Sequence, residues 1–175
     1  VVAATDASIA ALPGSTLNLV GGLVKNGTVA TLTGGGAITI SGAGISGASP
    51  NSDLVVDGSG TVVTLNTTNS YNGPTFVQNS GTLVLGLSNA LPTSPRTDLS
   101  LTTSGTFNLN SHSDAVAGLS GDATGTVRNR TPSTTSTLEI SPATSSTFSG
   151  VIAGTNGGTQ GDINLVKTGS GTQVL

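Results

Sequence analysis

The sequence predicts an all-β fold, a right-handed parallel β-helix (a β-solenoid) with about seven turns, or rungs, of roughly 24 residues each. Three observations predict it. The chain is rich in residues that favour strands and turns, with 26 Gly among its 175 residues, while only 7% of the residues are charged. Short segments alternate apolar and polar residues, as strands with one buried side do. These segments recur at a spacing that fits one circuit of a solenoid.

The segments are expected to place alternate side chains inside, stacked on their equivalents one turn away. Inward positions are predicted at Leu17, Leu19, Ile38, Ile40, Val63, Leu65, Leu83, Leu85, Phe107, Leu109, Leu138, Ile140, Ile163 and Leu165. A sandwich of hairpins would place strands every ~8–12 residues, so the longer spacing favours a solenoid. The longest interval, between Phe107 and Leu138, predicts a protruding loop near residues 121–132. A right-handed sense is expected because nearly all crossovers between parallel strands have it.

The domain organisation predicted is an N-terminal cap or linker at residues 1–14, followed by one β-helix segment at residues 15–175 that ends inside a repeat. A longer repeat overlies the short one, because residues 54–61 recur in similar form at 165–172. This favours a segment of a larger repetitive protein.

Three stretches combine turn residues and strand residues in a recognisable order. They read GSGT at 58–61, NSYNGPTFV at 69–77 and SGTLVLG at 80–86. This part of the chain resembles the autotransporter-associated β-strand repeat of bacterial passenger domains. The sequence departs from that pattern at Val56 and Asp57, where the family usually carries a Lys-Thr pair.

The resemblance implies a right-handed parallel β-helix that is exported across a bacterial outer membrane as part of a long passenger. It implies no catalytic residue, because the repeat carries none. The composition agrees with export without disulfides, since the chain has no Cys. Five basic residues and a pI near 4.6 give no electrostatic basis for binding nucleic acid or anionic lipid. No apolar run approaches the ~20 residues of a membrane helix, so direct membrane insertion by this segment is not expected.

Two groups of residues contain side chains of the kinds found in catalytic sites. Asp53 and Asp57 are the closest pair of acids, but they flank one strand and a Gly turn, and are expected to be solvated turn acids rather than a glycosidase pair. His112 and Asp114 lie in a Ser-rich stretch, so this stretch contains the three residue types of a Ser-His-Asp catalytic site. The sequence lacks a nucleophile elbow, so a surface histidine is the expected outcome.

Three further patterns in the sequence bear on metal binding, ligand binding and glycosylation. Residues 157–162 (GGTQGD) loosely resemble one copy of a calcium-binding solenoid repeat, but a single copy cannot build the shared set of oxygen ligands. Arg96, Arg128 and Arg130 could form a small basic patch on loops. Sequons at Asn26, Asn66 and Asn129 are expected by chance in a chain of this composition. No catalytic, metal-binding or cofactor-binding residue and no cofactor is therefore predicted.

The function predicted is structural, a β-helical stalk segment of a secreted or cell-surface bacterial adhesin-like protein, and not an enzyme. One alternative is a subunit of an extracellular fibre that stacks end to end. A less favoured alternative is a carbohydrate-binding or carbohydrate-active β-helix. The partners expected are neighbouring repeats of the same protein or copies of itself, with surface glycans or host matrix molecules as further candidates.

Overall fold

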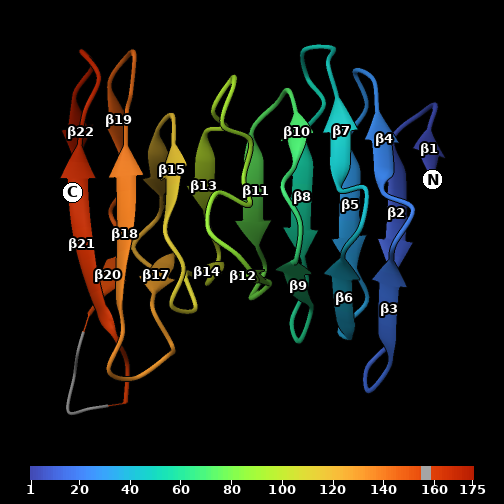
Figure 1. The fold of residues 1–175 in the computed structure, drawn as a ribbon, viewed down its shortest axis with the longest axis horizontal. Coiled ribbons are helices and arrows are strands. Elements are labelled where there is room, and N and C mark those ends of the chain that lie inside the picture. Colours follow the sequence, from blue (N-terminus) through green and yellow to red (C-terminus); the bar gives the residue numbers. More distant parts are fainter. Residues whose placement is uncertain (155–158) are drawn as a thin grey trace.

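A computed structural model describes residues 1–154 and 159–175 of the chain. In these residues the secondary structure consists of strands and turns, without a helix. Figure 1 shows the strands side by side along the long axis, with β1 (Val2–Ala3) at one end and β21 (Asp162–Lys167) and β22 (Gln173–Val174) at the other. Every ladder between named strands is parallel. The predicted fold is therefore confirmed: the chain is a β-solenoid with about seven turns, about 24 residues apart.

Each turn contributes strands to three faces of the solenoid. The first face contains β1 (Val2–Ala3), β4 (Leu23–Lys25), β7 (Ile45–Gly47) and β10 (Ser70–Tyr71), then β15 (Asp114–Val116), β18 (Thr135–Ile140) and β21 (Asp162–Lys167). The second face contains β2 (Ala7–Ala10), β5 (Ala30–Thr33), β8 (Leu54–Asp57), β11 (Thr75–Gln78), β13 (Leu99–Leu101) and β16 (Leu119–Gly121), then β19 (Ser146–Thr147) and β22 (Gln173–Val174). The third face contains β3 (Thr16–Leu19), β6 (Ala37–Ile40), β9 (Val62–Leu65), β12 (Thr82–Leu85), β14 (Thr106–Asn108), β17 (Thr126–Arg128) and β20 (Val151–Ala153).

The first face is interrupted between β10 and β15, where residues 86–98 replace a strand. This segment still connects its neighbours by hydrogen bonds. The Asn69 backbone N–H donates to the Ala90 carbonyl at 3.1 Å. The Leu91 N–H donates to the Asp114 carboxylate at 3.0 Å on the other side. The segment therefore completes a turn of the solenoid without forming a regular strand.

The core consists of apolar columns that run along the axis. On the third face, the register stacks fully buried side chains in the order Ile38, Val63, Leu83, Phe107 and Val127. A second buried column of the same face contains Ile40, Leu65 and Leu85. Removing such side chains from water is the main favourable term in folding, at roughly 25 cal/mol per Å². No single turn could bury both sides of its own column, so the stability comes from stacking.

The predicted place of Leu138 in this column was wrong. Val127 on β17 continues the column after Phe107, and Leu138 lies on the first face, where its register neighbours are Asp114 and Leu165. The sequence concealed β17 because its three residues carry only one apolar side chain, too few to display an alternation. The loop predicted near residues 121–132 was wrong for the same reason, since β17 lies inside that range.

The predicted burial of Leu165 was also wrong. Leu165 stacks on buried Leu138, as an inward residue should, but it remains 40% exposed. The cause is that β21 pairs only with β18, so one side of Leu165 is covered. Leu17, Leu19 and Ile163 are partly buried against the core.

The structure shows where the predicted N-terminal cap or linker and the two copies of the longer repeat lie. Residues 1–14 carry β1 and β2, which pair with β4 and β5, so they form part of the first turn. The similar stretches 54–61 and 165–172 begin on different faces, because Leu54 belongs to β8 and Leu165 to β21. The longer repeat in the sequence therefore does not correspond to one position around the solenoid.

Candidate functional site

The two acids at the ends of β8, Asp53 just before it and Asp57 as its last residue, have separate environments. Asp57 accepts a hydrogen bond from the Asn79 side-chain amide of the next turn at 2.7 Å. Asp53 has one carboxylate oxygen, Oδ1, that is buried without a hydrogen-bond partner among the described residues. Burial raises the pKa of Asp53, and the charge of Lys25 opposes that change. The two carboxylates therefore differ in their surroundings: Asp57 is bonded to the next turn, and one oxygen of Asp53 is buried.

A comparison between turns explains the unpaired oxygen of Asp53. Asp6 occupies the equivalent place before β2, and its Oδ1 accepts the Val29 backbone N–H at 2.8 Å. The residue that corresponds to Val29 beside Asp53 is Pro74, which precedes Thr75 in the register of β8 and β11. Proline has no N–H to donate. The same geometry that satisfies Asp6 thus leaves Asp53 without a donor.

The Asp114 carboxylate is bonded to the backbone in the structure. The two oxygens of Asp114 accept the backbone N–H groups of Leu91 and Ala115, at 3.0 and 2.8 Å. The nearby Ser113 hydroxyl accepts the Thr137 N–H at 2.8 Å. Burial raises the pKa of Asp114 to about 6. Asp114 therefore serves to bind the backbone where residues 86–98 interrupt the first face.

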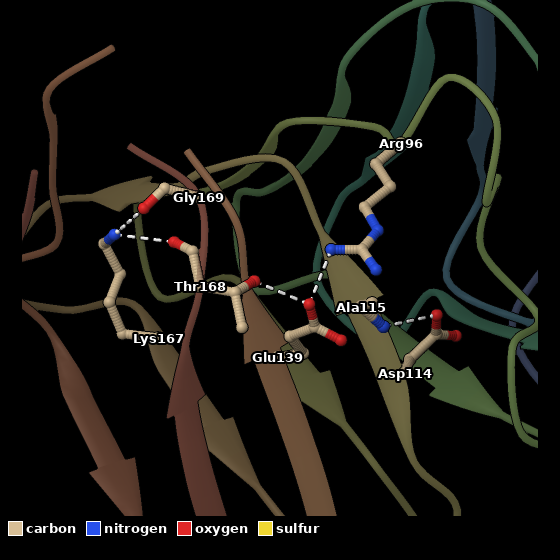
Figure 2. A network of polar contacts seen from close by, with 7 residues as sticks. All are labelled: Arg96, Asp114, Ala115, Glu139, Lys167, Thr168 and Gly169. Atoms are coloured by element: carbon tan, nitrogen blue, oxygen red, sulfur yellow. Dashed lines mark hydrogen bonds and ion pairs between the residues drawn. The ribbon is translucent and has the colours of Figure 1, made fainter. Parts of the chain in front are cut away.

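The three arginines do not form one patch. Arg96 forms an ion pair with Glu139 on β18, with 2.8 Å between Nη1 and Oε1, and the Thr168 hydroxyl donates to the same Oε1 at 2.6 Å. Figure 2 shows this network, in which Glu139 lies between Arg96 and Thr168. The hydrogen bond from Thr168 and the bond from Arg96 lower the pKa of Glu139. Arg128 and Arg130 line a separate hollow of about 350 Å³.

The candidate calcium segment lies partly outside the described residues, at 157 and 158. The backbone N–H groups of Gly161 and Asp162 donate to the carbonyls of Asn129 and Thr134, at 2.9 and 2.8 Å. Within the ranges 1–154 and 159–175, no group of three or more His, Cys, Asp or Glu side chains could hold a metal ion.

An interior polar cluster is the most unusual chemical feature, and the sequence-based prediction missed it. It consists of Lys25, Ser52, Tyr71, Thr75 and Thr97, all buried. Lys25 donates from Nζ to the Ser52 carbonyl at 2.6 Å, and Nζ lies 4.4 Å from the centre of the Tyr71 ring. The Tyr71 and Thr75 hydroxyls are 2.6 Å apart, and those of Thr75 and Thr97 are 2.9 Å apart.

The environment of Lys25 disfavours its charged form. Burial lowers the pKa of Lys25 to about 7, and the charge of Asp53 opposes this only in part. A signal for this residue was present in the sequence. Lys25 follows Leu23 at a distance of two residues in β4, so strand alternation directs both side chains to the same side.

Two surface hollows follow the corner between the first and second faces. One, of about 250 Å³, is lined by Pro50, Asn51, Asn72, Gly73, Pro74, Arg96 and Asp98. The other, of about 330 Å³, is lined by Asp98, Ala117, Gly118, Ser120, Pro142, Ala143, Thr144, Ser145 and Ser146. Because Asp98 lines both hollows, we name the pair together the corner groove. It was not expected from the sequence, because its residues come from five separate stretches of turn residues.

Comparison with known proteins gave no assignment: no protein family, no curated protein and no solved structure matches the chain. In the part of the chain that the structure describes, there is also no helix with the length and apolar character needed to span a membrane.

Proposed function

We propose that the chain is a structural stalk segment of a secreted or cell-surface bacterial protein, of the adhesin-like autotransporter passenger type. The observation that carries this proposal is the unbroken apolar column from Ile38 to Val127, in which each turn buries the next. An architecture of this kind extends along one axis by adding turns, which suits a spacer that holds other parts away from a surface.

The hydrogen bonds and the ion pair formed by the ionisable side chains support a structural role. Asp6, Asp114 and Asp122 each accept backbone N–H groups. Glu139 is held between Arg96 and Thr168. These side chains stabilise turns and strand ends, where unpaired backbone groups would otherwise cost free energy.

The extracellular location rests on the resemblance of residues 58–86 to the passenger repeat. A test uses antibodies raised against the purified chain, applied to intact and to lysed cells of the source bacterium. Labelling of intact cells that is removed by external protease is the expected result, with a cytoplasmic protein as the control that stays protected. Labelling only after lysis would contradict the location and, with it, the stalk function.

A second candidate function is a fibre subunit that associates end to end. It is favoured by apolar side chains exposed at both ends of the stack of turns. Val1 and Val2 are 63% and 71% exposed at one end, and Val174 and Leu175 are 49% and 61% exposed at the other. Contacts between unlike ends would continue as a filament rather than close into a ring.

A further inference from the structure

The corner groove is built from equivalent positions of successive turns. The register of β8, β11, β13 and β16 aligns Leu54, Thr75, Leu99 and Leu119. The residues directly before these four therefore also align, and they are Asp53, Pro74, Asp98 and Gly118. The groove consequently presents a series of polar and small residues along the axis, with a repeat distance of ~4.8 Å between turns.

Two glycines of the groove lie beside carboxylates, one that lines the groove and one that is buried next to it. A Cβ atom at Gly73 would lie 2.7 Å from Oδ1 of Asp53, and one at Gly118 would lie 2.9 Å from Oδ1 of Asp98. A larger residue at Gly118 would displace the Asp98 carboxylate, and one at Gly73 would press on the Ser52 backbone as well as on Asp53, because the Ser52 carbonyl oxygen would lie 2.8 Å from the added Cβ. The groove thus has one carboxylate in its lining, that of Asp98, which borders both hollows. The Asp53 oxygen lies buried beside Gly73 and does not line either hollow.

The charge and hydrogen-bonding character of the groove is mixed. Asp98 supplies acceptors and a negative charge, and Arg96 supplies donors and a positive charge, so the two charges are of opposite sign. Asn51 and Asn72 supply both donors and acceptors. The hydroxyl of Ser146 donates to the Leu119 carbonyl at 2.7 Å, so it offers the groove an acceptor. A ligand that fits this lining must offer many groups that donate and accept at once, and it must carry little net charge.

We propose that the corner groove binds an extended, uncharged oligosaccharide that lies along the solenoid axis. Sugar hydroxyl groups donate and accept hydrogen bonds, which matches the lining. The length of one sugar unit in an extended chain is close to the distance between turns, so successive units meet successive turns. Asp98, which lines both hollows, is the residue expected to contact the middle of the ligand.

An extended peptide fits the groove less well. Peptides are recognised by pairing with an open strand edge, by apolar or aromatic pockets, or by Arg clusters. The backbone beside the groove is already paired, since Leu54, Thr75 and Leu99 donate their N–H groups to carbonyls of the adjacent turn. The only apolar lining residues are alanines and prolines, which form no deep side-chain pocket.

The first experiment maps binding by NMR on the ¹⁵N-labelled chain. The probes are two uncharged hexasaccharides, cellohexaose and chitohexaose, and a six-residue Gly-Ser peptide. We expect at least one sugar to shift the amide signals of Asn51, Gly73, Gly118 and Ser146, with saturation. Shifts elsewhere, no shifts with either sugar, or tighter binding of the peptide at the same residues would each overturn the proposal.

Matched variants identify the contacts. Asp98→Ala removes a charged acceptor and should weaken sugar binding about tenfold, whereas Asp57→Ala, outside the groove, should leave it unchanged. Gly118→Ala places a methyl group against a movable carboxylate and should weaken binding while the chain still folds. Gly21→Ala is its control, because an added Cβ there meets nothing within 4 Å. Equal affinities for Asp98→Ala and the wild-type chain would contradict the proposed site.

Salt dependence distinguishes the uncharged ligand from a charged one. Screening weakens contacts between charges strongly as salt rises from ~0.1 M to ~1 M. The affinity for the bound hexasaccharide should stay constant over this range. A heparin-derived hexasaccharide that binds the same residues more tightly, and loses affinity with salt, would show that the groove selects polyanions and would overturn the proposal.

Discussion

The side-chain nitrogen of Lys25 lies 4.4 Å from the centre of the Tyr71 ring, and neither side chain has any exposed surface. A cation over an aromatic face is attracted by the ring, yet burial lowers the pKa of Lys25 to about 7. At neutral pH the attraction of the ring and of the Ser52 carbonyl is therefore opposed by the cost of removing the charge from water.

The pH dependence of stability should reveal this buried amine. The folded-state pKa of Lys25 is about 7, below its ordinary value of 10.5, so the unfolded chain binds more protons between these values. The free energy of unfolding should consequently rise with pH from 7 to 9, by at most about 1.4 kcal/mol per pH unit. Denaturant unfolding at several pH values measures it.

The control for that measurement is Lys25→Met, which fills similar space without a titrating group. The rise between pH 7 and 9 should be lost in the variant. A buried charge exchanged for an apolar side chain often leaves stability unchanged or increases it, so the variant should fold. An equal rise in both proteins would show that Lys25 is not the group that titrates.

Asp114 should make the free energy of unfolding fall as the pH rises, the opposite of the effect of Lys25. Burial raises its folded-state pKa to about 6, above the ordinary value of 3.8. Its contribution to stability is fully present below pH 3.8 and is lost as the pH rises through 6. Relative to the wild-type chain, Asp114→Asn should show a smaller loss of stability between pH 4 and 7. Asp57→Asn, at the end of β8, serves as the control. Identical pH profiles for the wild-type chain and Asp114→Asn would contradict the expectation.

The apolar columns predict a strong contrast between two substitutions to aspartate. Leu85→Asp places an unpaired charge in a fully buried column and should prevent folding or lower stability by about 4 kcal/mol or more. Ser88→Asp lies on the exposed part of the segment that interrupts the first face and should change stability by less than about 0.5 kcal/mol. Thermal melts of both variants provide the comparison, and similar melting temperatures would mean that the column is not what holds the turns together.

Association through the ends is testable by light scattering over a concentration series. If the exposed Val174 and Leu175 side chains dock on another copy, the wild-type chain should show a mass that increases with concentration. The double variant Val174→Lys, Leu175→Lys should remain monomeric because charge blocks such edges. A wild-type chain that is monomeric throughout would remove the fibre function and leave the stalk.

Much of the fold could be predicted because the inward residues of most turns alternate with polar ones. Ile38, Leu83 and Phe107 belong to strands with clear alternation, and each lies where the sequence indicated. Strand β17 was missed because Val127 is its single apolar residue, and its position is fixed by pairing with β14 rather than by its own sequence.

The candidate site was less predictable than the fold. The corner groove is assembled from turn residues far apart in the chain, and each of them alone reads as an ordinary surface residue. Lys25 could have been found by alternation, but its contact with Tyr71 depends on the order in which the turns stack, since β7 lies between β4 and β10. The lack of a donor for Asp53 becomes visible only when the register places Pro74 beside it.

The interior polar cluster has a consequence for how a protein of this kind can change in evolution. A solenoid whose turns all carry the same apolar column can gain, lose or exchange whole turns by recombination, because any turn fits on any other. Lys25, Ser52, Tyr71 and Thr97 come from successive turns and satisfy one another only in that order. A deletion of the turn that carries Tyr71 would remove the ring beside the buried amine of Lys25 and the hydroxyl that contacts Thr75. These turns should therefore be inherited as one block, while the turns on either side remain free to vary in number.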